Sequence, residues 1–170
     1  TRAHMPALVE GSAPAGRLRA ELAARWGLPA GVVVAGGGGD NAASAVGIGA
    51  TEPGQGFVSL GTSGVIFVVS DAYSPNPKDG VHAFCHAVPN TWHQMGVILS
   101  ATDSLNWLAE VTGREAAELT GELGDKLHAP GSVTFLPYLS GERTPHNDAA
   151  IRGVFAGLGH ESGRAALTQA

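Results

Sequence analysis

The sequence predicts an α/β fold, and three observations support this. Short apolar runs rich in β-branched residues alternate with segments of helical periodicity. Glycines and clusters of polar residues separate most of these segments. With 170 residues, of which 44% are hydrophobic and 15% charged, the chain is long and apolar enough to bury a core. A disordered tail or a highly charged scaffold is therefore excluded.

The N-terminal part predicts a helix, a strand, a glycine turn and a second helix, in that order. Apolar residues four positions apart predict a helix over 16–26, which Gly27 ends. The apolar run 32–35 predicts a strand that leads into the four glycines 36–39. Small residues follow Asp40, so we expect a buried helix to start there.

The rest of the chain predicts a hairpin and then alternating strands and helices. The β-rich segment 57–70 is interrupted by a polar tetrad, residues 61–64, which predicts the hairpin turn. Ser100 and Asp103 suit a helix N-terminus, and Gly113 suits its end. The further expected elements are a strand over 92–99, helices over 101–111 and 114–127, a strand over 133–136, an exposed polar loop over 140–147 and a helix over 164–170.

Composition excludes several classes of function. The formal net charge of −5 offers no basic surface for nucleic acid. Cys85 is the one cysteine, which excludes an internal disulfide and a multi-cysteine metal site. No run approaches the ~20 apolar residues of a membrane span, so we expect a soluble, cytoplasmic protein without a membrane partner. Thr1 and the uncapped helix at the other end predict an internal fragment.

The first candidate site is Asp40 with its neighbour Asn41, placed after four glycines at a helix start. Glycines let the backbone approach a ligand, and a helix N-terminus favours an ionised carboxylate. In phosphoryl transfer such a carboxylate can accept the proton of the attacking alcohol. The alternative from the local pattern is that Asp40 simply caps the helix, because aspartate is common at that position.

The second candidate site is the tetrad Gly61, Thr62, Ser63 and Gly64. Successive N–H groups and two hydroxyls in a tight turn can form an anion-binding nest for nucleotide phosphates. The tetrad lacks the ending of a Walker motif. A plain β-turn remains the alternative, since glycine and serine are ordinary turn residues.

Other polar residues carry less weight. His82, His86 and His93 have no spacing typical of a helical metal-ligand pair, so we expect no metal site among them. Arg143 and His146 could contact substrate or nucleotide, although charged residues in loops are usually solvated.

Three segments in this order and spacing resemble the FGGY family of carbohydrate kinases, in particular its members that act on D-xylulose. The segments are VAGGGGDNAA at 34–43, SLGTSGV at 59–65 and FLPYLSGERTPH at 135–146. GVFAGL at 153–158 is similar to the start of a further signature of the family. The resemblance runs from about Leu28 to the end of the chain but corresponds only to the middle of such an enzyme.

The resemblance implies a ribonuclease H-like fold of the actin and hexokinase type, with two domains that close on a cleft. The chain would span the junction: residues 1–52 would end the N-terminal domain, and residues 53–170 would begin the C-terminal domain. Because the remaining parts of both domains are missing, we expect the isolated chain to be inactive.

The resemblance also implies a function and its residues. The reaction would be phosphorylation of D-xylulose to D-xylulose 5-phosphate, with ATP as the donor and Mg²⁺ as the cofactor. Asp40 would be the general base and would contact the sugar together with Asn41, and residues 61–64 would hold the ATP phosphates. No metal ligand is assigned within the chain, and a homodimer is one candidate assembly.

Three alternatives stay open at this point. Another FGGY kinase, acting on gluconate, glycerol or a different ketose, would share these motifs. A non-catalytic sugar- or nucleotide-binding protein could use the same fold, because fold does not determine function. A small β-rich domain whose glycines only make turns would show no affinity for nucleotide.

Overall fold

The computed structural model describes residues 2–126 and 129–170 in two compact units. The first unit contains the chain up to residue 57 together with 67–75 and 83–94; the second contains 58–66, 76–82 and the chain from 95 onward. Residue 1 belongs to the predicted segment 1–52, and residues 127 and 128 belong to 53–170. Residue 127 is also the end of the predicted helix 114–127. All three lie outside the described residues.

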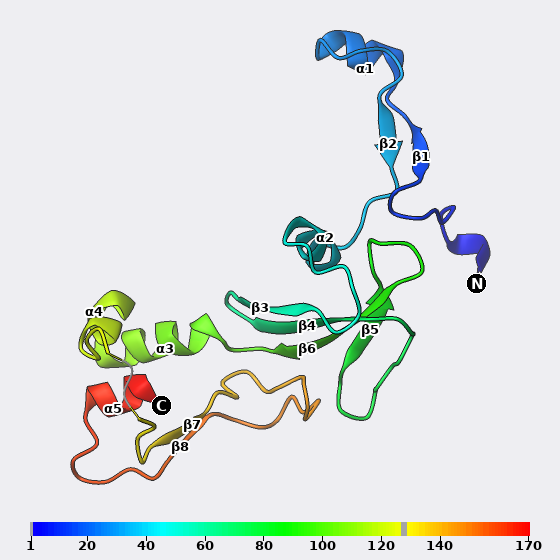
Figure 1. The fold of residues 1–170 in the computed structure, drawn as a ribbon. Helices are drawn as coiled ribbons and strands as arrows, with labels where there is room; N and C mark the ends of the chain where they lie inside the picture. The colour runs from blue at the N-terminus through cyan, green and yellow to red at the C-terminus, as the bar shows by residue number, and fades with distance from the viewer. Residues whose placement is uncertain (1, 127–128) are drawn as a thin grey trace. The chain divides into compact units, whose positions relative to one another are not determined.

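The chain contains both helices and strands, as Figure 1 shows, and the α/β class is confirmed. The elements are a 3₁₀ helix η1 (Arg2–His4), β1 (Pro14–Arg17), α1 (Ala20–Arg25), β2 (Val33–Ala35), α2 (Asp40–Gly47), β3 (Gly56–Leu60), β4 (Gly64–Ser70), β5 (His82–Cys85), β6 (Trp92–Ile98), α3 (Thr102–Thr112), α4 (Ala116–Gly121), β7 (Thr134–Leu136), β8 (Val154–Ala156) and α5 (Arg164–Gln169). None of the helices in the described ranges is both long and apolar enough to cross a bilayer.

Four strands form the largest sheet, in the order β3-β4-β6-β5. Neighbouring strands β3 and β4 are joined by residues 61–63, so the predicted hairpin is confirmed. All four strands contribute residues to both units.

In the first unit, β1 and β2 pair antiparallel, and α1 lies at the end of this two-stranded ribbon (Figure 1). The prediction of a helix over 16–26 is wrong at its start. The N–H of Leu18 donates to the Val32 carbonyl at 2.8 Å, which prolongs the pairing of β1 with β2, so the helix begins only at Ala20. Its end is as predicted: Gly27 has a positive φ of 68°, typical of a helix C-terminus.

The second unit is held together by helix packing and by an aromatic stack. Leu108, Ala109 and Leu119 form a buried cluster that joins α3 to α4, and Leu167 of α5 packs against it. The predicted helix over 114–127 is shorter than expected. It ends at Gly121, because the chain turns at Gly124, whose φ is 71°.

The aromatic stack joins α3 to the pair of strands β7 and β8. These strands are antiparallel, with Phe135 opposite Phe155 and their ring centroids 4.4 Å apart. The Trp107 ring stacks 6.0 Å from Phe135. The strand expected over 133–136 is thereby confirmed, and α3 is positioned against it.

Candidate functional site

Two of the four glycines before Asp40 pack closely against other parts of the first unit. A Cβ atom added at Gly36 would lie 2.5 Å from the Glu10 carbonyl oxygen, and one added at Gly38 would lie 2.9 Å from the Ala87 Cβ. Gly37 has a positive φ of 81°. A Cβ at Gly37 or at Gly39 would meet no atom within 4 Å, but only Gly37 has a backbone conformation that strains other residues. Packing within the first unit at Gly36 and Gly38, and the positive φ at Gly37, therefore account for three of the four glycines without a ligand.

Asp40 is the first residue of α2, and its carboxylate is held on one side. Gly39 occupies the N-cap position without a side-chain cap. The Asn41 main-chain N–H donates to Asp40 Oδ1 at 2.8 Å, and the Asn41 side-chain amide donates to the same oxygen at 3.2 Å. Oδ2 has no hydrogen-bond partner within residues 2–126 and 129–170, and Asp40 is exposed. The arrangement orients one oxygen and leaves the other able to accept a proton.

Helix α2 is short, and its small residues bring it close to the rest of the first unit. Ala42 and Ala45 are buried, while Val46 is exposed. The expectation of a buried helix is therefore right for one face only. Ala50 closes the helix end, because its N–H donates to the Ala45 carbonyl at 2.8 Å.

The tetrad 61–64 lies in the second unit and caps the N-terminus of α3 with its carbonyl groups. The N–H and the hydroxyl of Thr102 donate to the Gly61 carbonyl at 3.0 and 2.8 Å. The N–H groups of Ala101 and Asp103 donate to the Thr62 carbonyl at 2.8 and 3.5 Å. These bonds satisfy N–H groups that a helix leaves unpaired at its start.

Ser100 and Asp103 were predicted to suit this helix start, but neither side chain caps the helix. The N-cap residue is Ala101, and no side chain caps the helix. Ser100 is instead buried, and its hydroxyl has no partner in the described ranges. The main-chain oxygens of the tetrad take the place that a capping side chain would fill.

The two hydroxyls of the tetrad have different environments. Ser63 Oγ donates to the Leu99 carbonyl at 3.1 Å, so its one proton is directed into the protein. The Thr62 hydroxyl and the N–H groups of Thr62 and Ser63 make no hydrogen bond in the described part of the chain, and both residues are exposed. Two main-chain donors and one hydroxyl are thus free to bind an anion.

The polar loop 140–147 is not wholly exposed, contrary to expectation. Glu142 is only 3% exposed, and its Oε1 accepts the Leu99 N–H at 3.0 Å. Thr144 Oγ1 accepts the Val97 N–H at 3.0 Å and donates to the Gly80 carbonyl at 3.0 Å. These contacts attach the loop to β6 and to the residue that follows it, and within the loop Gly141 and Glu142 are buried.

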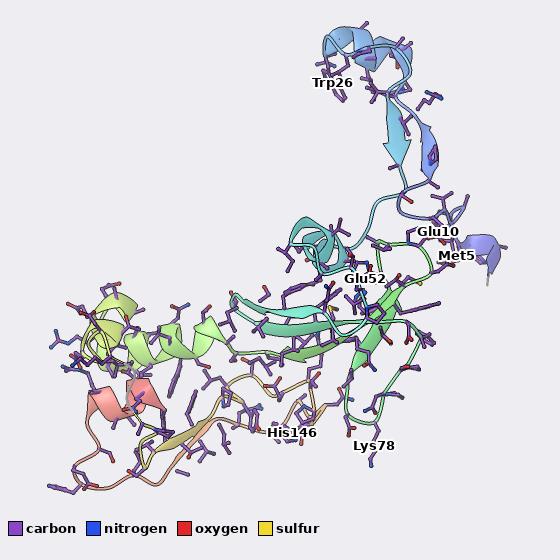
Figure 2. The ribbon with its side chains drawn as sticks, viewed as in Figure 1. Met5, Glu10, Trp26, Glu52, Lys78 and His146 are labelled. Atoms are coloured by element: carbon purple, nitrogen blue, oxygen red, sulfur yellow. The ribbon has the colours of Figure 1, made fainter. Side chains whose placement is uncertain are left out.

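Arg143 and His146 remain on the exposed side of this loop. His146, labelled in Figure 2, has its Nε2 2.9 Å from the Tyr138 hydroxyl. The structure therefore gives His146 a partner in Tyr138, two residues before the loop begins. Whether either residue contacts a ligand stays a prediction.

Two of the three histidines lie in the core of the first unit. His93 stacks on Phe67 at 4.3 Å, and His86 is 5.9 Å from His93 in an edge-on arrangement. Val88 donates its N–H to His86 Nδ1 at 3.0 Å. Burial, with a smaller repulsive contribution from His86, lowers the pKa of His93 to about 4. The pKa of His86 is also lowered by burial, although the Ala50 carbonyl opposes the shift.

No group of three or more histidine, cysteine, aspartate or glutamate side chains suited to a metal ion occurs among the residues that the structure describes. His86 and His93 both pack against the Phe67 ring in the aromatic core.

A cavity of about 430 Å³ lies beside α3 in the second unit. Leu60, Leu105 and Phe155 contribute to its mainly apolar wall, and Ser100 also borders it. Residues 61–63 do not line it. The free donors of the tetrad are consequently on an exposed turn and not inside this apolar cavity.

The C-terminal domain of the FGGY family of carbohydrate kinases matches residues 56–170, and the N-terminal domain of the same family matches residues 1–47. The chain belongs to the FGGY family of carbohydrate kinases. The family resemblance predicted from the three motifs is thereby confirmed.

Relatives within the FGGY family align along almost the whole chain. A crystal structure of a xyloylose kinase from Brucella ovis superimposes with a TM-score of 0.95 at 65% identity, covering 99% of this chain and 35% of that one. A xylulose kinase from Klebsiella pneumoniae is 51% identical over 171 residues, covering 100% of this chain and 35% of the relative. A structure of a xylulose kinase from Rhodospirillum rubrum superimposes with a TM-score of 0.78 at 32% identity, covering 92% of this chain and 32% of that one.

The chain spans about a third of the length of these FGGY relatives. The predicted fold, of the actin and hexokinase type and spanning the junction of the two family domains, is confirmed. The division of the sequence at residues 52 and 53 stays a prediction.

Two residues with roles at the candidate site were not found from the sequence. Thr102 supports the tetrad through the Gly61 carbonyl, and Glu142 reaches Leu99 from 43 positions away. Local patterns do not show such contacts. The one available signal for Glu142 was its position inside the FLPYLSGERTPH motif, which is longer than a plain connecting loop requires.

Proposed function

We propose that the complete protein containing this chain is an ATP-dependent kinase that phosphorylates D-xylulose on its terminal hydroxyl, giving D-xylulose 5-phosphate and ADP. The choice of sugar is supported by the names of relatives that align along the whole chain. The observation that carries the kinase chemistry is the exposed turn at Thr62 and Ser63, which keeps two main-chain N–H groups and a hydroxyl unused while its carbonyls hold a helix.

The tetrad binds the phosphates of ATP through main-chain dipoles. The N–H groups of Thr62 and Ser63 and the Thr62 hydroxyl donate to phosphate oxygens, which suits a chain without net positive charge. Gly64 lets the turn pack closely against the end of β6, because a Cβ there would lie 2.8 Å from Ile98 Cγ1. The Ser63 hydroxyl takes no part in phosphate binding while it donates to the Leu99 carbonyl.

Asp40 is the general base in this proposal. Its Oδ2 accepts the proton of the terminal sugar hydroxyl as that oxygen attacks the γ-phosphorus, and the bond from the γ-phosphorus to the bridging oxygen breaks to release ADP. Asn41 orients the carboxylate through Oδ1, and its half-buried side chain can also contact the sugar. Gly39 is the N-cap of α2, so the alternative in which Asp40 caps the helix is wrong. Asn41 holds Oδ1, and Oδ2 is the oxygen that acts as the base in this proposal.

Mg²⁺ is not given a protein site in this part of the molecule. The described residues contain no cluster of metal-ligating side chains, so the donor set present here does not fit a resident metal. Mg²⁺ in kinases is commonly bound by substrate phosphates and one or two carboxylates, and any such carboxylates would come from elsewhere in the protein. No step of the reaction is derived through it.

Further predictions belong with this proposal. They are the inactivity of the isolated chain, a cytoplasmic location, a homodimeric assembly and the domain division at residues 52 and 53.

The test uses the full-length protein with ATP, Mg²⁺ and D-xylulose, with ADP release as the readout. Asp40→Asn keeps the size of the side chain but removes the base, so we expect kcat to fall by about 10²- to 10⁴-fold with ATP affinity unchanged. Ser44→Ala, on an exposed position one turn along α2, is the control and should keep normal activity.

A substrate panel completes the test. D-xylulose should give a higher kcat/KM than gluconate or glycerol, and a preference for one of those would replace the proposed sugar. Near-normal turnover in Asp40→Asn would exclude Asp40 as the base. Absence of ADP release from the wild-type protein with every sugar would favour the non-catalytic alternative.

A further inference from the structure

Leu99, between β6 and α3, is held at both of its main-chain polar groups by side chains from distant parts of the second unit. Its N–H donates to Glu142 Oε1 at 3.0 Å, and its carbonyl accepts the Ser63 hydroxyl at 3.1 Å. These bonds fix the two peptide units on either side of the Leu99 Cα. Leu99 therefore connects the loop 140–147 to the tetrad 61–64.

Glutamate is an unusual residue at a buried position if its role is packing alone. Its Oε1 accepts two main-chain N–H groups, from Leu99 at 3.0 Å and from Arg143 at 2.7 Å. Its Oε2 is buried without a hydrogen-bond partner in the described ranges. A buried carboxylate with an unused oxygen opposes folding, because the lost hydration is not fully replaced. Fold stability alone does not explain a carboxylate at this position.

We propose that Glu142 is a positioning residue for the phosphate-binding turn. By holding the Leu99 N–H it fixes the carbonyl to which Ser63 is anchored, so that the free N–H groups of Thr62 and Ser63 keep their direction toward the phosphates. This inference rests on the proposed function of the tetrad. Glu142 touches neither the phosphates nor the sugar in this scheme.

The direction in which the KM for ATP changes when Glu142 is replaced distinguishes a positioning role from a direct electrostatic effect. A negative charge near a phosphate site weakens anion binding, so removing the charge of Glu142 would tighten ATP binding if charge alone mattered. Loss of positioning has the opposite result, since the donors of the turn lose their alignment. A rise in the KM for ATP on removal of Glu142 is therefore a specific expectation of the proposal.

The loop offers a matched control. Thr144 lies two residues from Glu142; its hydroxyl binds Val97 in β6 and Gly80, which precedes β5. Its side chain makes no bond to Leu99 or to the tetrad among the described residues. Thr144→Val removes two hydrogen bonds from the loop, as Glu142→Leu does, but leaves the connection to Ser63 in place.

The experiment measures kinetics of the full-length protein with ATP and D-xylulose. We expect Glu142→Leu to raise the KM for ATP about tenfold, the size expected for losing a hydrogen bond to a charged group, while the KM for D-xylulose changes less than twofold. Glu142→Gln keeps an acceptor oxygen and should restore most of the ATP affinity. Thr144→Val should leave the KM for ATP within twofold.

A double variant tests whether Glu142 acts on the tetrad through Leu99 and Ser63. If Glu142 acts through Ser63, Glu142→Leu combined with Ser63→Ala should raise the KM for ATP no more than the larger single change. Fully additive effects would mean that the two residues act independently. That result, or an equal loss of ATP affinity in Thr144→Val, would overturn the proposal.

Amide hydrogen exchange of the nucleotide-free, full-length protein tests the positioning role of Glu142 independently of the proposed kinase activity. Glu142→Leu should increase exchange in the peptide covering 60–66, and Thr144→Val should increase it only around 95–98 and 76–82. This outcome would support positioning of the turn even if the protein lacked kinase activity. Unchanged exchange over 60–66 in Glu142→Leu would refute the positioning role even in an active kinase.

Discussion

The glycine run before Asp40 allows a stability test with an internal control. Gly36→Ala would place a methyl group 2.5 Å from the Glu10 carbonyl oxygen and 2.8 Å from Val9 Cγ2. Because these contacts include main-chain atoms, the segment must move, and the hydrogen bond from the Gly36 N–H to the Ala13 carbonyl at 3.0 Å is strained with it. Overpacking of about 1–3 kcal/mol and a weakened hydrogen bond of about 1 kcal/mol give an expected destabilisation of about 2–4 kcal/mol.

Gly39→Ala is the control for this change. Its φ of −60° is accessible to alanine, and the added methyl group meets no atom within 4 Å. The lower entropy of the unfolded chain, about 0.4–1 kcal/mol, is offset by the poorer N-cap preference of alanine, so we expect a net change near zero.

The assay is urea unfolding of the full-length protein, followed by hydrogen exchange in the peptide covering 34–40. We expect Gly36→Ala to lose protection in this peptide and Gly39→Ala to keep it. If Gly39→Ala weakens sugar binding without loss of stability, Gly39 is the one glycine of the run that a ligand requires. Equal stability of the two variants would refute the assignment of the run to internal packing.

Two further predictions concern the aromatic core and the helix start. Because the pKa of His93 is lowered to about 4, the unfolded chain binds a proton more readily than the folded one. The free energy of unfolding should therefore be highest above pH 6.5 and should fall by up to about 3 kcal/mol as the pH drops to about 4. His93→Leu should flatten this dependence in pH-dependent unfolding, and an unchanged slope would contradict it. Thr102→Val should destabilise by about 1 kcal/mol because the bond from its hydroxyl to the Gly61 carbonyl is lost, whereas Thr102→Ser should not; equal unfolding midpoints for the two variants would exclude that bond as the cause.

Local patterns predicted the elements whose ends are marked by glycine or by a change of periodicity. The hairpin around residues 61–63, the helix that begins at Asp40 and the end of α3 at Gly113 all follow from such signals. The predicted start of α1 was wrong because Leu18 pairs with Val32 and so prolongs the pairing of β1 with β2. Periodicity within 16–26 cannot reveal this pairing.

The candidate site was predictable in its residue types but not in its bonding. The sequence indicated hydroxyls and N–H groups in the tetrad, yet the direction of the Ser63 hydroxyl depends on Leu99, 36 positions away. The burial of Glu142 likewise depends on a contact across 43 positions. The role of the glycines 36–38 required knowledge of the segment around Glu10 (Figure 2) and of Ala87, both distant in sequence.

The start of α3 is protected from mutation in an indirect way. Since its partners are the main-chain oxygens of Gly61 and Thr62, a changed side chain at either position cannot delete them. Evolution could therefore vary the hydroxyl offered at position 62, and with it the affinity for a bound anion, while the helix keeps its anchor. Proline at 101, 102 or 103 is the change that would break this independence, because proline has no N–H group to donate.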